Sequence, residues 1–360
     1  MNQKKDSFSS QAWRKLQRNK TAMAGLIIII LAMLTGIFAY FIAPDNSSNA
    51  DTQIVEIQAK KPGYKKLFLA VKKNMQDEKP GFFKQLLYGK ENVFNYIPVN
   101  KFSITGESVI AEKYIDEGVS ESITYTIQQL ADEPVVKKTF WLGTDRFGRD
   151  ILSRLIIGVR VSLAVGFIAV IISLTIGVFL GSMAGYYRGK TDNVIMWLIN
   201  VIWSIPTLLL VFGITIALGK GFWQVFIAVG LTMWVNVARL VRGQVLALKQ
   251  MEYIQAARAL GFRDSRIIFK HMLPNIAGPL IVIAASNFAT AIIIEAGLSF
   301  LGIGVQPPTP GWGSMIKEHY NFIITHNPAL ALAPGIAIMI LVLAFNLLGN
   351  GLRDAFDVRK

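Results

Sequence analysis

The chain contains no cysteine among its 360 residues. A disulfide framework, a thiolate metal site and a cysteine nucleophile are therefore excluded, while the redox compartment stays open. Acids are also scarce, because 23 Asp and Glu face 37 Lys and Arg and leave a formal net charge of +14. In a soluble protein this excess would suggest nucleic acid as a partner, but Lys and Arg also collect on the cytoplasmic side of membrane proteins.

Long stretches of the chain carry almost no charge. Hydrophobic residues make up 52% of the sequence, and its mean hydropathy is +0.44. A bilayer core of about 30 Å needs roughly 20 apolar residues in a helix, which predicts six membrane spans. The first is too long for the apolar region of a cleaved signal peptide. The predicted spans are Ala22–Ala43, Val161–Tyr187, Val194–Leu218, Gly221–Ala238, Gly278–Ile303 and Pro328–Leu352.

The positive charges indicate how these spans are oriented. With the N-terminus inside, the short inner segments carry 18 Lys and Arg, whereas the short outer loops carry only Lys220 and Lys317. This asymmetry predicts an all-α polytopic membrane protein with both termini in the cytoplasm. A nucleic-acid partner then loses its main support, and none is expected.

Residues 44–138 form a polar stretch that this topology places outside the cytoplasm. Gly81–Gly89 predicts a short amphipathic helix, and Lys101–Ile110 and Ser120–Gln128 show alternation typical of strands. We therefore predict three regions. Residues 1–43 hold the N-terminus and first span, residues 44–138 a small mixed α/β extracytoplasmic insert, and residues 139–360 a helical core of five spans.

The basic cytoplasmic segment Arg239–Pro274 has the signals of two short helices. Glu252–Leu260 forms the first, and Gly261 ends it in a left-handed conformation. The second, Arg266–Leu273, begins at a cap and is closed by proline. The predicted capping and closing residues are Asp264 or Ser265 and Pro274. A basic interfacial hairpin and a docking site remain alternatives, the second with the small residues Ala256, Ala257 and Gly261 on its open surface. A DNA-reading motif would be pinned between two spans.

A double G-x-x-x-G pattern in the second span lets another helix approach closely. We expect its glycines to pack within the bundle or against a partner, with a place on a substrate path as the alternative. These are Gly177, Gly181 and Gly185.

One acid, Glu295, lies within a predicted span, where an unpaired charge is costly. It is either a hydrated interfacial acid or a polar group that faces a partner interface or a pore. Pro206 can kink the third span, because proline removes a backbone hydrogen bond. We assign Glu295, Ser299 and Pro206 to a translocation path or a subunit interface.

Catalytic and ligand-binding patterns are weak. Gly185–Thr191, GYYRGKT, is one residue short of a phosphate-binding loop and follows a membrane helix, so no ATP site is expected. Asp145 and Asp150 are expected to form ion pairs rather than a catalytic pair, because arginines flank them. No cofactor or catalytic residue is expected. No metal site is expected either, because the histidines share no metal-ligand spacing. These are His271, His319 and His326.

Residues 252–274, EYIQAARALGFRDSRIIFKHMLP, resemble the "EAA" coupling loop of the inner-membrane permeases of ABC importers. The segment matches that pattern at Ala256, Ala257, Gly261, Leu273 and Pro274. It departs at Gln255, where an acid is typical. The resemblance implies a site for coupling to ATPase subunits, to which Glu252 and Asp264 also belong.

Three further stretches resemble the oligopeptide, dipeptide and nickel permeases of the "C" subunit type. They are Leu142–Leu163, Glu295–Gly313 and Asn346–Arg353. The resemblance implies a bacterial-type inner membrane and three kinds of protein partner: a related permease, two cytoplasmic ATPases that hydrolyse ATP, and an extracytoplasmic substrate-binding protein. Membrane lipid is the surrounding solvent. Peptides are the expected substrate, with nickel or another small solute as the alternative.

Two other classes of protein fit the sequence less well. A secondary transporter or channel that works alone predicts internal repeats or several charges at mid-membrane depth, and only Glu295 is present. A membrane-embedded enzyme would need a set of catalytic residues at the end of a span, and the sequence shows none there.

Overall fold

The computed structural model describes residues 8–73, 81–219, 221–324 and 327–356. Lys220 and His326, considered above as a loop charge and a metal ligand, lie outside these residues. The chain forms two compact units. The bundle unit comprises Met1–Ala32, Ser162–Gln306 and Ile338–Lys360, and the sheet unit comprises Met33–Val161 and Pro307–Ala337.

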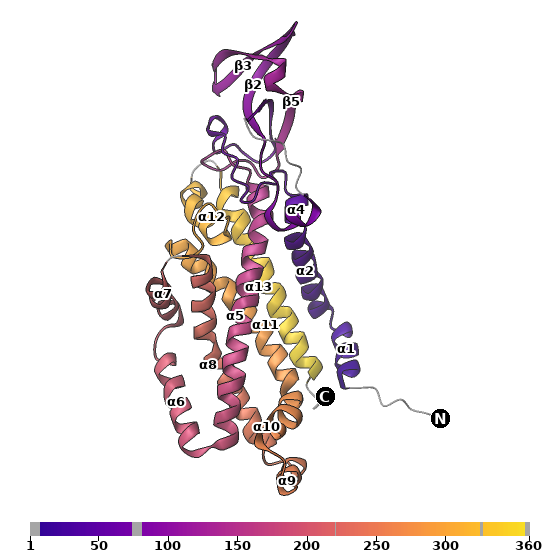
Figure 1. The fold of residues 1–360 in the computed structure, drawn as a ribbon, viewed down its shortest axis with the longest axis vertical. Coiled ribbons are helices and arrows are strands. Elements are labelled where there is room, and N and C mark those ends of the chain that lie inside the picture. Colours follow the sequence, from indigo (N-terminus) through magenta and orange to yellow (C-terminus); the bar gives the residue numbers. More distant parts are fainter. Residues whose placement is uncertain (1–7, 74–80, 220, 325–326, 357–360) are drawn as a thin grey trace, which may run out of the picture. The chain divides into compact units, whose positions relative to one another are not determined.

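Long helices build the bundle unit (Figure 1). In the described part of the chain, five helices are long and apolar enough to cross a membrane, and a bent pair raises the number to six. This confirms a predominantly helical chain with five or six candidate spans. The long helices are α2 (Lys20–Ile37), α5 (Ile151–Tyr187), α8 (Phe222–Leu248), α11 (Ala277–Leu301) and α13 (Ala329–Phe356).

The third predicted span is not one helix. It divides into α6 (Gly189–Trp203) and α7 (Thr207–Leu218), whose axes differ by 93°. Pro206 stands at the break and has no N–H to continue the helical ladder. The prediction of a single span with a kink understated this bend.

Two helices are longer than their predicted spans. Helix α5 begins at Ile151, ten residues before the predicted start at Val161, and α8 runs on to Leu248, ten residues beyond Ala238. The predictions stopped where charges appear. A charged residue ends a membrane-buried segment but does not end a helix, because arginine is a good helix former.

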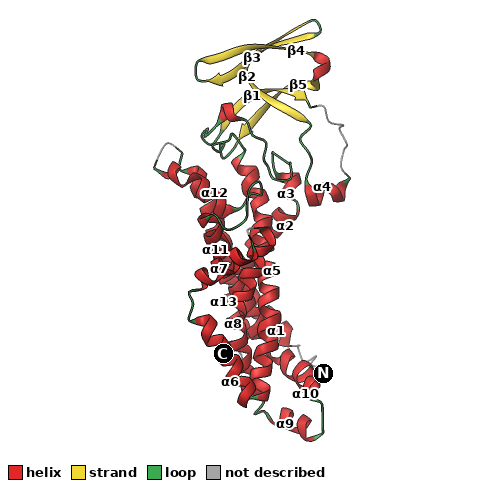
Figure 2. Ribbon diagram, turned by 60° about the vertical axis from the view of Figure 1, so that its left-hand side comes forward, coloured by secondary structure: helices red, strands yellow, loops and turns green. Residues whose placement is uncertain are grey.

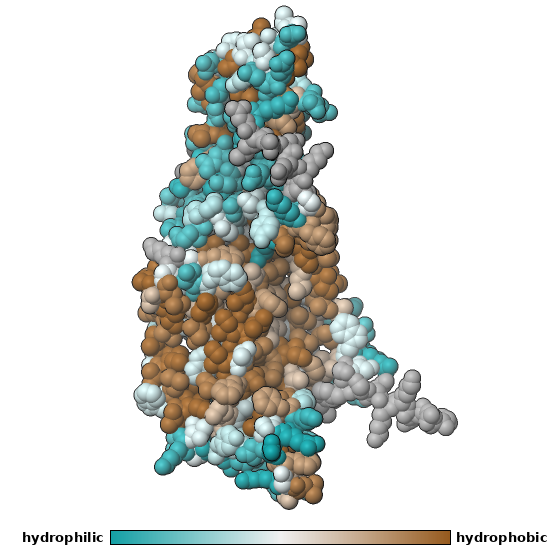
Figure 3. All heavy atoms as spheres, viewed as in Figure 1, coloured by the Kyte–Doolittle hydropathy of each residue, from teal (hydrophilic) through white to brown (hydrophobic). Residues whose placement is uncertain are grey.

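Apolar side chains cover the outer faces of the long helices (Figure 3). Ile27, Leu31 and Leu34 of α2 are each about half exposed. Leaving such surface in water is costly, so lipid is the solvent that suits this face. Helix α1 (Phe8–Arg18), the α5–α6 turn, α9 (Glu252–Ala259) and the end of α13 lie at one end of the bundle unit (Figure 1).

Small residues join α2 to α13. A methyl group at Gly25 would lie 2.6 Å from the carbonyl oxygen of Ala344, and one at Gly351 would lie 2.1 Å from Cβ of Ala22. These distances are shorter than atoms can approach, so the two helices touch through their backbones.

A five-stranded antiparallel sheet forms the core of the sheet unit (Figure 2). Its order is β4-β3-β2-β1-β5, and Leu67 of β1 pairs with Val99 of β2. The strands are β1 (Tyr64–Lys72), β2 (Phe94–Thr105), β3 (Ser108–Asp116), β4 (Val119–Thr126) and β5 (Leu130–Phe140). Short helices α3 (Ala39–Ile42), α4 (Phe82–Tyr88) and α12 (Trp312–His319) belong to the same unit.

The insert has the predicted mixed character, but its strands differ in detail. Helix α4 lies inside the predicted Gly81–Gly89, and β4 coincides closely with Ser120–Gln128. The predicted strand Lys101–Ile110 is wrong, because the chain reverses at Gly106 between β2 and β3. Neither β1 nor β5 was predicted. Strand β5 contains Pro134, which is tolerated there because β5 lies at the edge of the sheet.

A buried arginine gathers three acids in the sheet unit. The Arg149 Nε lies 2.5 Å from Asp145 Oδ2, as the sequence predicts. Its other nitrogens lie 3.1 Å from Asp51 Oδ1 and 2.8 Å from Glu318 Oε2 of α12. Both Asp145 and Arg149 are almost fully buried.

Asp150 does not form the predicted ion pair with any residue that the structure describes. Its Oδ2 accepts hydrogen bonds from the backbone N–H and the hydroxyl of Ser153. Asp150 directly precedes α5, and Ser153 is the third helical residue. This is the geometry of an N-cap, where a carboxylate satisfies a backbone donor that the helix leaves free.

The pKa of Lys138 gives the sheet unit a predictable pH dependence. Its Nζ lies 3.0 Å from the centroid of the Tyr96 ring, and burial lowers the pKa from 10.5 to about 8, although Asp45 and Asp150 oppose the change. Between these pH values the unfolded chain binds more protons than the folded chain. The free energy of unfolding should therefore rise as pH increases from 8 to 10.

Melting of the purified protein at pH 7.5 and 9.5 tests this dependence. Lys138→Met should remove the increase in melting temperature. Lys137→Met, at the exposed neighbouring position, should keep it. An increase that survives in Lys138→Met would contradict the assignment.

Candidate functional site

Helix α9 lies against the end of the bundle unit through one face. Ile254 and Ala257 are buried, one turn apart on α9, in a cluster of apolar side chains. The rest of that cluster comes from α5, α8 and the segment that leads into α11. Its other buried members are Tyr186, Val237, Val241, Val245, Ile267, Ile268, Met272 and Ile276.

The opposite face of α9 is open. Tyr253, Gln255, Ala256 and Leu260 are exposed, and Leu260 keeps 75% of its surface. The expectation that Ala257 belongs to this open surface is wrong, because its side chain packs on the bundle. The exposed face is therefore formed by Ala256 and larger apolar groups.

Gly261 ends α9 with φ +78°, as predicted. The N–H of Phe262 donates to the carbonyl of Ala257, and the N–H of Gly261 donates to that of Arg258. These two bonds form the Schellman motif, which satisfies carbonyls left free at a helix end. A methyl group at Gly261 would meet nothing within 4 Å, so glycine is required there by the backbone and not by space.

The structure contains the second predicted helix, but this helix begins and ends at other residues than predicted. Helix α10 (Asp264–Arg266) continues through a π-helical turn, Ile267–Met272, and a 3-10 turn, Leu273–Ile276, into α11. Pro274 does not close it. Proline stands in the first turn of the 3-10 segment, where its missing N–H is not needed, so the chain stays helical from Asp264 to Leu301.

Asp264 binds another helix and does not cap its own. No side chain caps α10, and the Asp264 Oδ1 instead accepts a hydrogen bond of 2.6 Å from the Tyr186 hydroxyl. The backbone oxygen of Tyr186 also accepts a hydrogen bond from Lys249 Nζ, just beyond α8. Tyr186 thus joins the ends of α5, α8 and α10.

Tyr186 was not among the predicted site residues. Its partner Asp264 lies 78 residues away, so no local spacing reveals the contact. The only signal is its position directly after Gly185, the last of the three glycines at which α5 packs closely on α8.

Gln255 has a specific contact of its own. Its Nε2 donates a hydrogen bond of 3.1 Å to the backbone oxygen of Gln250 in the turn after α8. The acid that is typical at this position cannot donate such a bond. Glu252 is the first residue of α9, where a negative charge is favourable at the helix N-terminus.

The three predicted packing glycines lie where α5 crosses α8. A methyl group would lie 2.4 Å from Val237 Cβ at Gly177, 2.4 Å from the Ala238 oxygen at Gly181, and 2.8 Å from the Arg242 oxygen at Gly185. The two helices are therefore in close contact over about two turns. This contact continues directly into the cluster beneath α9.

The structure corrects both expectations for Glu295. Its side chain has no exposed surface, so it is neither a hydrated interfacial acid nor a group that faces a partner interface or an open pore. Its Oε1 accepts a hydrogen bond of 2.6 Å from the Ser299 hydroxyl, one turn along α11. Ser299 Oγ also accepts the N–H of Val305, so this pair fixes the end of α11. Pro206, by contrast, is exposed at the α6–α7 break.

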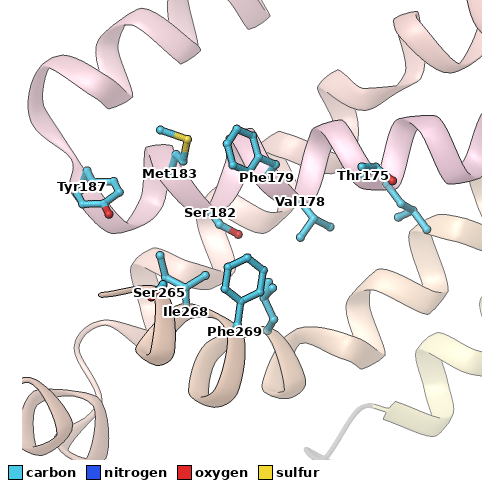
Figure 4. Close-up of a pocket in the computed structure, with 11 residues that line it drawn as sticks. Thr175, Val178, Phe179, Ser182, Met183, Tyr187, Ser265, Ile268 and Phe269 are labelled. Atoms are coloured by element: carbon cyan, nitrogen blue, oxygen red, sulfur yellow. The ribbon is translucent and has the colours of Figure 1, made fainter. Parts of the chain in front are cut away.

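An apolar pocket of 670 Å³ lies between α5 and the π-helical turn. Figure 4 shows Val178 and Ser182 of α5 facing Ile268 and Phe269 across it, and Phe179 also lines the pocket. Leu273, one of the predicted coupling residues, lines the same pocket. The π-helical turn therefore stands partly clear of α5.

One group of side chains in the sheet unit has the spacing of metal ligands. Atoms of Asp145, Glu318 and His319 lie within 4.8 Å of one another. Arg149 already bonds both carboxylates. Its charge opposes a further cation, so the group fits an internal ion-pair cluster better than a metal centre.

Comparison with known proteins places this arrangement in a family. The family described as "binding-protein-dependent transport system inner membrane component" matches residues 177–360, which contain α6 to α13. The chain belongs to this family. The description "N-terminal TM domain of oligopeptide transport permease C" matches residues 7–62. Family membership confirms the resemblance to importer permeases and makes the chain a multi-pass inner-membrane protein.

Individual relatives agree. Glutathione transport system permease protein GsiD of Pectobacterium atrosepticum is 44% identical over 217 residues, which cover 60% of this chain and 72% of the relative. Oligopeptide transport system permease protein OppC of Bacillus subtilis is 42% identical over 227 residues, covering 63% and 74%. A solved inward-facing MetNI methionine ABC transporter matches 57% of this chain and 98% of its own, with 21% identity and a TM-score of 0.48.

Proposed function

We propose that this chain is the permease subunit of an ATP-driven importer of short peptides, and that α9 and α10 receive the ATPase subunits. Family membership supports the transport role, and relatives named for glutathione and oligopeptide transport support the substrate class. The observation that carries the coupling role is the two-sided environment of α9. Ile254 and Ala257 fix it to the bundle, while Gln255 and Ala256 stay exposed.

The proposed partners follow from this role. They are a second related permease, two cytoplasmic ATPases that hydrolyse ATP, and an extracytoplasmic substrate-binding protein. The end of the bundle unit that carries α9 also carries Arg188, Lys190 and Lys249. We assign this end to the cytoplasm, because Lys and Arg collect there.

Force applied to α9 has two routes into the bundle. Ile254 and Ala257 push on the apolar cluster, which contains residues of α5 and α8. The hydrogen bond from Tyr186 to Asp264 ties the second arm of the loop to α5. Because packed interiors deform little, movement of the loop becomes movement of whole helices.

Docking in this proposal depends on shape more than on acidic charge. Gln255 replaces the typical acid and uses its amide to hold α9 to the Gln250 backbone. Ala256 and Leu260 leave an apolar surface beside it. Burial of such a surface favours association without a salt bridge.

Replacing Gly261 with leucine tests the coupling role. A side chain at φ +78° costs roughly 1–2 kcal/mol, and the helix end must change to relieve it. We expect peptide transport by the reconstituted importer to fall roughly fivefold to thirtyfold, which is that energy expressed as a ratio. Recovery of ATPase with the purified permease should weaken, while the amount of permease in the membrane stays normal.

Gly118→Leu is the matched control. Gly118 has φ +81° in the β3–β4 turn, and nothing lies within 4 Å of a methyl group there. The Gly118→Leu substitution imposes similar backbone strain at a position that is far from α9 in the sequence. If Gly261→Leu transports as well as Gly118→Leu, the docking role of this loop is wrong.

A further inference from the structure

A small polar cavity lies in the bundle unit beside the break between α6 and α7. Its volume is 130 Å³, enough for several water molecules at about 10–15 Å³ of probe volume each. Trp203 and Leu210 stand at the broken helix, and α8 and α11 complete the walls. The polar lining residues are Thr207, Thr232, Asn236, Ser286, Asn287 and Thr290.

One side of this cavity is open. Asn236 of α8 and Ser286 and Thr290 of α11 are exposed, although all three lie within candidate membrane spans. Polar groups at such positions seldom face lipid, which cannot satisfy their hydrogen bonds. This face therefore borders water or a polar molecule that passes along it.

The N-terminus of α7 supplies donors at the cavity. The first hydrogen bond of this helix runs from the N–H of Leu210 to the oxygen of Pro206, so the N–H groups of the residues between them have no acceptor in the helix. No side chain caps α7. Such an end carries partial positive charge and favours an anion.

Arg239 adds a full positive charge on the same side. It lies on α8 one turn beyond Asn236 and two beyond Thr232, a spacing that puts all three on one helix face. Its guanidinium carbon lies 3.6 Å from the centroid of the Trp203 ring, and Trp203 lines the cavity. One nitrogen donates a hydrogen bond of 3.4 Å to Asn200 Oδ1.

The guanidinium of Arg239 is not fully satisfied within this chain. Its Nε is buried and makes no hydrogen bond, and within the described residues no carboxylate pairs with it. Arg242, one turn further along α8, is different. It binds Asp192 through two nitrogens at 2.5 and 2.7 Å. Arg242 is thus a structural ion-pair partner, whereas Arg239 has no carboxylate partner among the residues that the structure describes.

We propose that this cavity and Arg239 hold the C-terminal carboxylate of a peptide as it crosses the membrane. A guanidinium binds a carboxylate through two parallel hydrogen bonds, and the uncapped end of α7 adds further donors. The Asn, Ser and Thr side chains suit peptide amides. The cavity accepts only the end of a peptide, so the remainder lies along the exposed polar face. This inference rests on the proposed peptide transport.

The test uses the complete importer in proteoliposomes. The probes are one tripeptide with a free C-terminus and the same tripeptide as its C-terminal amide, chosen so that the isolated binding protein binds both equally. Arg239→Gln should slow import of the free peptide about tenfold to a hundredfold, as expected for loss of hydrogen bonds to a charged group. Import of the amide should change less than twofold. Arg239→Lys keeps the charge without the two-pronged geometry and should give an intermediate rate.

Arg353→Gln, an exposed residue near the end of α13, is the control for loss of one positive charge and should alter neither rate. Equal losses for both peptides, or no loss for either, would overturn the carboxylate site. So would failure of Arg239→Gln to assemble with the second permease, which would assign Arg239 to an acid of that subunit. If the unchanged importer carries neither peptide, the proposed peptide transport itself fails, and this outcome differs from all the others.

Discussion

Arg149→Gln is expected to destabilise the sheet unit by about 3–5 kcal/mol, the cost of removing one partner from a buried group of ion pairs. Arg154, whose Nε lies 3.9 Å from Asp145 Oδ2, is then the remaining cation beside Asp145. Asp145 has no exposed surface, and the Glu318 side chain keeps only 14%. Glutamine can replace one hydrogen bond but no charge. The purified protein should therefore show an early unfolding transition several degrees below that of the unchanged protein.

The neighbouring arginine gives the control for this experiment. Arg146 is exposed, and its guanidinium lies 4.6 Å from the centroid of the Phe147 ring. Arg146→Gln should change the free energy of unfolding by less than about 0.5 kcal/mol, as is usual for surface positions. Equal melting temperatures for the two variants would show that the acids around Arg149 do not need its charge.

Gly181→Leu is expected to separate α5 from α8 and to abolish transport. Its Cβ would lie 2.4 Å from the backbone oxygen of Ala238 and 2.9 Å from Cβ of Val241, and backbone cannot turn aside as a flexible side chain can. Overpacking by one side chain typically costs about 1–3 kcal/mol. Here the displacement also reaches Val241 and the cluster that holds α9.

Substitution by alanine gives a milder version of this test and allows a matched control on α8. Gly181→Ala should lower the melting temperature, because even one methyl group has no room. Gly243→Ala, on the exposed side of α8 with nothing within 4 Å, should be neutral or stabilising by up to about 1 kcal/mol from helix propensity. If both alanine variants behave alike, the close approach of α5 and α8 does not matter for stability.

The lengths of the apolar stretches and the residues that favour turns were enough to predict much of the fold. Five of the predicted spans have a helix at their centre, and Gly261 adopts the left-handed conformation that ends α9. The break between Trp203 and Thr207 could not be read in this way. The stretch is apolar throughout, so hydropathy treats it as one span, and a single proline does not reveal whether a helix bends slightly or by 93°.

The candidate site was predictable in its local parts only. The motif residues from Glu252 to Asp264 are close in sequence, so one segment reveals them. Tyr186 and Arg239 depend on partners from other helices, and neither has a spacing that points to them. Arg239 was further hidden by its position at the end of a charge-free run, where it counted as the first residue of a loop.

The continuous helical segment from Asp264 to Leu301 makes the second arm of the loop and the fifth predicted span one mechanical body. At 1.5 Å per residue its 38 residues would span about 57 Å. The hydrogen bond from Tyr186 to Asp264 fixes one end of this helical segment. A rotation of about 5° at that point would carry the opposite extremity through roughly 5 Å, about the pitch of one helical turn. Small movements beside α9 thus become larger movements at Glu295 and Ser299, which lie near the opposite end of the segment.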